Sequence, residues 1–158
     1  MRWTDLENEA CPVARGLSVI GERWTLLILR DCFLGVRRFD DFQASLGITR
    51  HLLADRLKTL EAKGLLRREQ YQERPPRFEY RLTETGKDLF PVLVSLITWA
   101  NCALPSPEGS PYRLVSRQTG QRVTPVLCDD ETGARLNPRN LRLLMPGEDA
   151  PGDEPPRR

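Results

Sequence analysis

The chain has 158 residues, which is room for one domain of ordinary size or for one domain with a small appendage. Its net charge is only +2, from 24 basic and 22 acidic residues, so the overall balance does not by itself indicate a nucleic-acid partner. All but three of the basic residues are arginine, whose planar guanidinium suits phosphates and guanine edges. A GC-rich genome would give the same excess of arginine.

Three further features limit the class of protein. The N-terminal segment MRWTDLENEA is acidic and has no apolar core, so we expect no signal peptide. The longest uncharged stretch, residues 89–104, is shorter than the ~20 residues of a membrane span, which favours a buried helix. The four cysteines are scattered without paired spacing, as in a cytoplasmic protein with free thiols. We therefore expect a cytoplasmic protein with no membrane segment.

The first strong helical pattern covers residues 24–33, and it predicts a helix that buries Trp24, Leu27 and Ile28. A second, shorter helix is predicted over residues 39–46. In both segments the apolar residues recur three or four positions apart, so each helix should pack one face on the core.

A tight connection over Gly47, Ile48 and Thr49 follows the second helix. Gly47 can adopt the left-handed conformation that ends a helix, and Thr49 is a good N-cap for the next one. The third helix, residues 50–63, has its leucines on one stripe and polar residues on the opposite face. A short helix, a tight turn and a helix with a polar outer face form the helix-turn-helix pattern, which is a moderately specific signal.

Residues 65–71 and 77–82 alternate in character and predict two strands of a hairpin. A hairpin directly after the second helix of a helix-turn-helix is a wing. This one carries five arginines within fifteen residues. They are Arg67, Arg68, Arg74, Arg77 and Arg81. We expect those near the base of the wing to pair with Glu69 and Glu79 across the hairpin.

Thr83 is predicted to cap a long helix over residues 84–103, which Pro91 should kink or open locally. The apolar residues of this helix lie on more than one face. A helix of this kind in a small domain usually buries its second face against a partner, so we expect a homodimer. The N-terminal segment around Trp3 and Leu6 should contribute to the same interface.

Three prolines within residues 105–111 mark a linker that follows a first domain, residues 1–104. We expect residues 112–145 to form a small β-rich appendage and residues 146–158 to be disordered. No internal repeat is apparent. The predicted fold class is mostly α with a small β-hairpin wing, a winged helix-turn-helix, followed by the β-rich appendage.

Short motifs across residues 10–104 stand in the order typical of one protein family. They are Cys11-Pro12, Ile20–Trp24, Arg38-Phe39, Gly47–Thr49, Leu57–Glu61, Gly64-Leu65, Pro75-Pro76, Glu79-Tyr80 and Leu82–Gly86. Together they resemble the HxlR-type transcription regulators. The resemblance implies a winged-helix homodimer that binds operator DNA near the genes it controls, with the dimer built by the N-terminal and C-terminal helices. It also implies that a cysteine at the position of Cys11 senses oxidants or electrophiles in some members.

The segment 117–133 resembles a short ribbon of some family members, in which Cys-Gly knuckles form two turns. Here the knuckle positions hold Gln118–Gly120 and Glu131–Gly133, and Cys128 is the one cysteine that remains. A structural zinc site needs four ligands. We therefore expect a metal-free ribbon that keeps its turns, and no metal or other cofactor in the protein.

The candidate DNA-binding residues come from the start of the predicted recognition helix, its outer face and the wing. They are Arg38, Thr49, Arg50, His51, Ala54, Lys58, Arg74 and Arg77. Residues 23–81 contain 13 basic and 8 acidic residues, a net +5 per chain and +10 per dimer, as a phosphate-binding surface requires. The first turns of a recognition helix meet base edges. The alternative for Lys58 is an ordinary solvated pair with Asp55.

Cys11 is the candidate redox-sensing residue, and an oxidant or a small molecule is the effector that this implies. Arg15 lies four residues on and could stabilise its thiolate. The alternative is that Cys11 only packs, as we expect for Cys32 and Cys102 on their apolar helices.

Two other functions are less compatible with the sequence. No nucleophilic triad, paired carboxylates or phosphate-binding glycine loop is legible, so we do not expect an enzyme. A winged helix used only for protein contacts is the alternative, but its wing would not need so many arginines.

Overall fold

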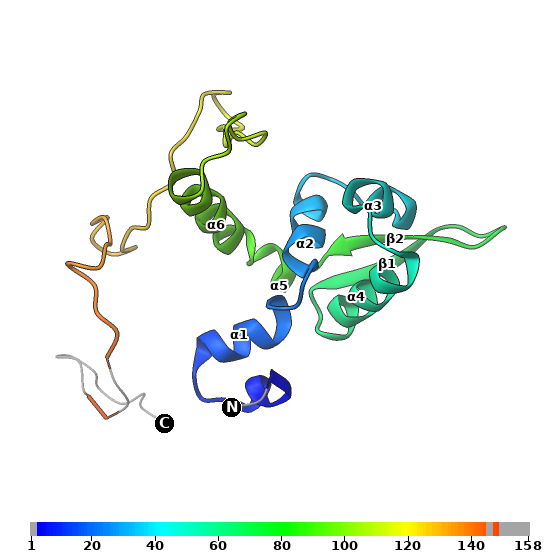
Figure 1. The fold of residues 1–158 in the computed structure, drawn as a ribbon, viewed down its shortest axis with the longest axis horizontal. Helices are drawn as coiled ribbons and strands as arrows, with labels where there is room; N and C mark the ends of the chain where they lie inside the picture. Colours follow the sequence, from blue (N-terminus) through cyan, green and yellow to red (C-terminus); the bar gives the residue numbers. More distant parts are fainter. Residues whose placement is uncertain (1–2, 145–146, 149–158) are drawn as a thin grey trace. The chain divides into compact units, whose positions relative to one another are not determined.

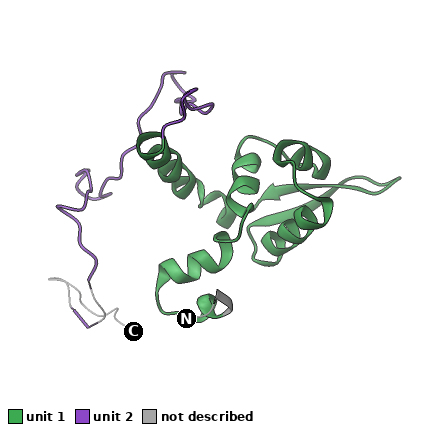
Figure 2. Cartoon of the chain, viewed as in Figure 1, with its two compact units in different colours: residues 1–104 green, residues 105–158 purple. Residues whose placement is uncertain are grey.

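The computed structural model describes residues 3–144 and 147–148, and the chain divides into two compact units, residues 1–104 and 105–158 (Figure 2). The first unit is mostly helical with one two-stranded antiparallel sheet, which confirms the predicted fold class (Figure 1). Its elements are η1 (Trp3–Asn8), α1 (Pro12–Ile20), α2 (Thr25–Phe33), α3 (Phe39–Leu46), α4 (Arg50–Ala62), β1 (Leu66–Gln72), β2 (Arg77–Leu82), α5 (Glu84–Lys87) and α6 (Phe90–Ala103). Among the described residues, no helix has the length and apolar character to span a membrane.

The core of the first unit forms where α2, α3 and α4 meet β1 and α6. Leu53, Leu57 and Leu60 are buried on one face of α4, as their spacing predicted. The prediction for α2 was wrong at Leu27, which is 39% exposed, whereas Leu29 is fully buried. The helix begins at Thr25, one residue later than expected, and its buried face runs through positions 25, 28 and 29.

The turn between α3 and α4 has the predicted construction. Gly47 ends α3 with φ +65°, a left-handed conformation that glycine adopts without strain. The side-chain oxygen of Thr49 accepts a hydrogen bond from the backbone N–H of Leu52 at 3.3 Å and so caps α4. Ile48, between them, is buried in the core. This turn therefore sets the angle at which α4 leaves α3.

The hairpin pairs β1 with β2 in an antiparallel register that matches Leu66 to Leu82, with one irregularity near the tip. A third segment extends this sheet beside β2. Arg38 forms an isolated bridge with Glu79, and the N–H of Tyr80 donates to the carbonyl of Arg37 at 2.8 Å. The hairpin is thereby attached to the residue that precedes α3, and the wing has a defined position relative to the helix-turn-helix.

Thr83 and Gly86 fasten α5 to the start of β1. The Thr83 hydroxyl donates to the carbonyl of Gly64 at 2.6 Å and accepts from the N–H of Gly86 at 3.0 Å. The N–H of Thr83 donates to the carbonyl of Leu65 at 3.1 Å. Gly86 is buried so close to Leu65 that a Cβ atom at position 86 would overlap the Leu65 carbonyl oxygen. Glycine is therefore required here for its small size.

The single long helix predicted over residues 84–103 is instead two helices. α5 ends at Lys87 and α6 begins at Phe90, with a turn at Asp88 and Leu89. Pro91 has no N–H to donate to the carbonyl of Lys87, so a continuous helix would lose a hydrogen bond at this point. In the first turn of α6 that N–H is not needed, which is where proline is well tolerated.

The second unit departs from the prediction of a β-rich appendage. Over residues 105–144 it contains two isolated β-bridges, Val115 with Arg122 and Cys128 with Arg135, and no longer strand. The predicted tail, residues 146–158, lies outside the described residues except for 147 and 148.

An internal repeat is present in the second unit, contrary to the sequence-based expectation. Segments 114–123 and 127–136 are offset by thirteen residues and share leucine, threonine, glycine and arginine at matching positions. Their backbone hydrogen bonds also match. Those from Val123 to Leu114 and from Leu136 to Leu127 measure 2.9 and 2.8 Å. Each segment is one closed turn, so both predicted knuckle-like turns are present.

Candidate nucleic-acid interface

The outer face of α4 carries four predicted site residues, all of them exposed. They are Arg50, His51, Ala54 and Lys58. The opposite face of the helix is fixed in the core by its leucines, so this orientation is determined by packing. A helix held in this way presents a polar surface with a small residue, Ala54, at its centre, where close approach to a groove meets no bulky side chain.

Arg50 makes three contacts with α3 that the sequence did not indicate. Its guanidinium donates to Asp40 at 2.9 Å and to Gln43 at 3.0 Å, and it lies 4.7 Å from the centre of the Phe39 ring. The ion pair is exposed, with 66% of the Arg50 side chain and 81% of the Asp40 side chain accessible. Exposed ion pairs contribute little net free energy, so Arg50 can exchange Asp40 for another acceptor at little cost.

Arg38 connects the helix-turn-helix with the wing. It is the residue before α3, and its exposed guanidinium lies 4.7 Å from the centre of the Tyr71 ring in β1. Tyr71 is itself 40% exposed and was not among the predicted site residues. Its spacing along β1 is ordinary for a strand, so no feature of the sequence distinguished it.

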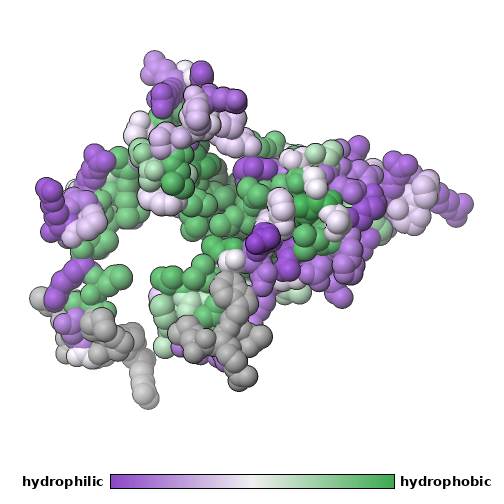
Figure 3. Space-filling model, viewed as in Figure 1, coloured by the Kyte–Doolittle hydropathy of each residue, from purple (hydrophilic) through white to green (hydrophobic). Residues whose placement is uncertain are grey.

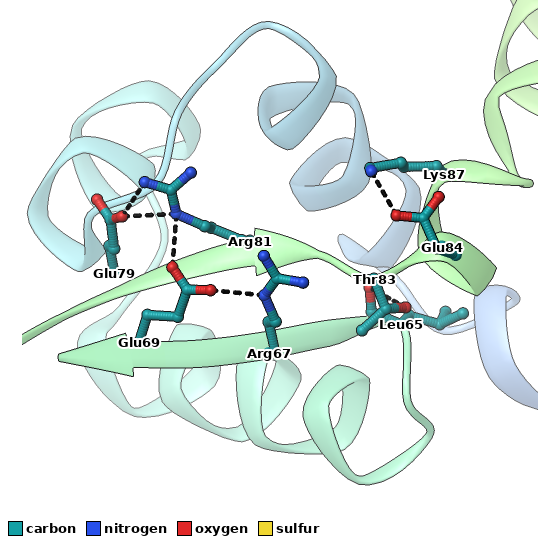
Figure 4. A network of polar contacts seen from close by, with 8 residues as sticks. All are labelled: Leu65, Arg67, Glu69, Glu79, Arg81, Thr83, Glu84 and Lys87. Atoms are coloured by element: carbon teal, nitrogen blue, oxygen red, sulfur yellow. Dashed lines mark hydrogen bonds and ion pairs between the residues drawn. The ribbon is translucent and has the colours of Figure 1, made fainter.

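The base of the wing holds a network of ion pairs, shown in Figure 4. Glu69 accepts from Arg67 at 2.6 Å and from Arg81 at 2.8 Å, and Arg81 also contacts Glu79 at 2.5 Å. The pair of Arg81 with Glu69 crosses the hairpin, as predicted, whereas Arg67 pairs with Glu69 along β1 itself. Arg68 does not join them, because its guanidinium stacks 3.6 Å from the centre of the Phe78 ring.

The tip of the wing presents two exposed cations. Arg74 and Arg77 are both exposed, and neither forms an ion pair within the part of the chain that the structure describes. The loop between them is ordered by Gln72, whose side chain donates to the carbonyls of Arg74 and Pro75, each at 3.1 Å. The two arginines at the tip therefore differ from those at the base in being available to an external anion.

The cysteines of the first unit lie in three different environments. Cys11 is exposed as the N-cap of α1, and Arg15 nearby donates to the backbone carbonyls of Glu9 and Ala10. Burial, with a further contribution from the Asp31 carboxylate, raises the pKa of the Cys32 thiol to about 12, so Cys32 is a packing residue as expected.

The same expectation was wrong for Cys102, which is exposed on α6. Among the described residues, no three His, Cys, Asp or Glu side chains come together as a metal site.

Exposed apolar side chains gather on α6 and α1, and Figure 3 shows the apolar surface over α6. On α6 they form one stripe of Val92, Leu96 and Trp99, which are 43%, 40% and 57% exposed. On α1, Val13 and Leu17 are 67% and 41% exposed. Leu6 was expected to join this surface but is buried in its own chain, where η1 packs on α1. The described side chains do not include Trp3.

This arrangement of α3, α4 and a hairpin defines a winged helix-turn-helix, a DNA-binding fold of transcription regulators. The HxlR-like helix-turn-helix family matches residues 19–108, and the chain belongs to this family. It is therefore a DNA-binding transcription regulator of the helix-turn-helix type. This is a family of regulators rather than of enzymes.

Similar proteins extend the match beyond the winged helix. An HTH-type transcriptional regulator of Mycobacterium tuberculosis, Rv3095, is 46% identical over 143 residues, which cover 89% of this chain and 90% of that protein. The crystal structure of PA1607, a candidate transcription factor, is 39% identical and superposes with a TM-score of 0.79, covering 87% of this chain and 96% of that one. The redox regulator HypR in its reduced form is 35% identical with a TM-score of 0.56, covering 60% and 96%.

Proposed function

We propose that the protein is a homodimeric regulator that binds operator DNA with the outer face of α4 and with the tip of the wing. The observation that supports this most strongly is the contrast within the wing. Its base is neutralised by internal ion pairs, while Arg74 and Arg77 at the tip have none within the described chain. A wing used for protein contacts would have no need of free cations at its tip. Such a regulator works on the chromosome, which places it in the cytoplasm.

Dimerisation is part of this proposal and rests on the exposed apolar residues. The stripe on α6 repeats at positions 92, 96 and 99, which lie on one side of a helix. A contiguous apolar surface of this kind marks an interaction site. A twofold dimer uses the same surface on both subunits, so one stripe is sufficient to build the interface.

Footprinting on the DNA upstream of the protein's own gene tests operator binding. Two recognition helices related by a twofold axis engage successive major grooves, so the protected half-sites should form a pseudo-palindrome with centres ~10 bp or a multiple apart. Protection without such symmetry would contradict the proposed dimer.

Arg50 and Arg77 should contribute to binding in different ways. Arg50→Ala should relax base preference at one position in each half-site, at a cost of ~1–3 kcal/mol if the contact is bidentate. Arg77→Ala should weaken binding to all DNA similarly. It should also reduce the slope of the logarithm of the binding constant against the logarithm of the salt concentration by about one for each phosphate that is no longer neutralised. Fluorescence anisotropy with operator and scrambled DNA over a series of salt concentrations measures both. If both variants change only general affinity, the assignment of the α4 face is wrong.

We further propose that oxidation of Cys11 modulates DNA binding. Cys11 is exposed at the N-cap of α1, a helix that also carries the exposed Val13 and Leu17, and a similar protein is named a redox regulator. A bond from Cys11 to another thiol would change the spacing of the two recognition helices. Titration with a mild oxidant should therefore lower the DNA affinity of the wild type by about tenfold or more and leave Cys11→Ser unaffected. An identical response of both proteins would assign Cys11 to packing alone.

A further inference from the structure

A small pocket in the first unit has a cationic lining. It measures about 210 Å³ and lies between α2, the segment leading into α3, the hairpin and α5. Four cations line it, namely Arg37, Arg67, Arg81 and Lys87. The described residues of the lining include no carboxylate, and Val36 and Leu82 supply apolar surface. The side chains of Arg67, Arg81 and Lys87 are among those drawn in Figure 4.

The surrounding carboxylates leave several donors of these cations unused. Arg67 contacts Glu69 through Nε alone, and Lys87 pairs with Glu84 at 2.6 Å. Arg81 engages its carboxylates through Nε and Nη2. Arg37 forms no ion pair with any described residue. Four cations thus share three carboxylates, and the excess positive charge and the free guanidinium N–H groups favour an anion.

The pocket is distinct from the proposed DNA-binding surface. None of the four exposed residues on the outer face of α4 lines it. A concave site suits a small ligand rather than a duplex, and its volume is below the ~300–1,000 Å³ of pockets that hold drug-sized ligands. We infer that it binds a small organic anion through a carboxylate or phosphate group, and that the bound anion changes the affinity of the protein for DNA.

The position of the pocket would allow a bound anion to affect the DNA-binding elements. Lys87 ends α5 and is separated by a two-residue turn from α6, which carries the proposed dimer surface, and Arg37 precedes the N-cap of α3. An anion held by both side chains would restrain α6 relative to the helix-turn-helix. A ligand that favours one such arrangement shifts DNA affinity in proportion to its preference for it. This regulatory effect rests on the proposed function, whereas binding of the anion does not.

Thermal unfolding of the full chain tests the binding step without DNA. Sodium benzoate and inorganic phosphate are titrated separately at constant ionic strength, with chloride as the reference salt. The probe whose anionic group is the one that the pocket binds, present at ten times its Kd, should raise the Tm of the wild type by about 5 °C or more. This rise should saturate as the concentration of the probe increases. Arg37→Gln and, as a second variant, Lys87→Gln should each weaken this response by about tenfold. Arg122→Gln, which removes an exposed cation from the second unit, should respond like the wild type.

The result decides the inference in each case. A saturable rise with benzoate assigns a carboxylate ligand, and a rise with phosphate assigns a phosphate ligand. The binding site would be overturned if neither probe raised the Tm of the wild type. It would also be overturned if the Tm of Arg37→Gln and of Lys87→Gln rose as much as that of the wild type.

A second measurement tests regulation. The effective probe should change the Kd for upstream DNA by about fivefold or more in the wild type and not in Arg37→Gln. An unchanged Kd would overturn the regulatory step. A lower salt slope in Arg37→Gln, with its thermal response intact, would assign Arg37 to a DNA phosphate and overturn the inference. A protein that binds no DNA but keeps its thermal response would contradict the proposed function alone.

Discussion

A Gly86→Ala substitution is expected to lower the free energy of unfolding by about 2–3 kcal/mol. The added Cβ would overlap the carbonyl oxygen of Leu65, which is backbone and cannot rotate away. Relief would require α5 to move from β1, and the hydrogen bonds that Thr83 makes to Gly64 and Leu65 would be strained or broken. Chemical denaturation followed by circular dichroism measures the change.

Gly16→Ala is the matched control for this prediction. Gly16 lies within α1, and a Cβ at its position would meet no atom of any other segment within 4 Å. Alanine is the better helix former, so this variant should be more stable than the wild type by about 0.5–1 kcal/mol. If Gly86→Ala were as stable as the wild type, the close packing of α5 against β1 would be contradicted.

Trp99→Glu is expected to convert the dimer into monomers and to lower the affinity for operator DNA by about 100-fold. Trp99 is 57% exposed in the single chain, so the substitution should leave the fold of the monomer intact. In the proposed dimer it would place two unpaired carboxylates in an apolar interface, which is strongly unfavourable. The DNA affinity falls because each monomer then binds its half-site alone, without the effective concentration that linkage provides.

Light scattering at micromolar concentration measures the change in oligomeric state. Asn101→Glu introduces the same charge on an exposed position of α6 that lies away from the apolar stripe, and it should remain dimeric. A wild-type protein that is already monomeric, or a Trp99→Glu variant that remains dimeric, would show that the stripe on α6 is not the interface.

Local sequence rules predicted the helix-turn-helix well because its signals are short-range. The period of the leucines in α4, the left-handed Gly47 and the cap at Thr49 each depend on residues within a few positions of one another. Pro91 likewise indicated a disturbance of the last helix, but the rule did not distinguish a kink from a complete break. Leu27 was misassigned because the expected stripe was counted from Trp24, which precedes α2 as its N-cap in a left-handed conformation and so does not share the helical spacing.

The features that were missed depend on contacts between distant segments. Asp40 reaches Arg50 across the turn, and the pocket near Arg37 draws its lining from four separate segments. Neither arrangement leaves a periodicity or a motif in the sequence by which it could be predicted. The repeat in the second unit escaped notice because its two segments share four of ten residues, and the cysteines that would have marked both knuckles are absent.

Operator binding is tested most directly by an anisotropy titration of the full chain with labelled DNA from upstream of its own gene. Scrambled DNA of the same length serves as competitor, and the salt concentration is varied. We expect binding by two chains per site, a preference for the upstream sequence of about 10³-fold or more, and affinity that falls steeply with salt. Equal affinity for both sequences, or affinity that does not depend on salt, would contradict the assignment of α4 and the wing as an operator-reading surface.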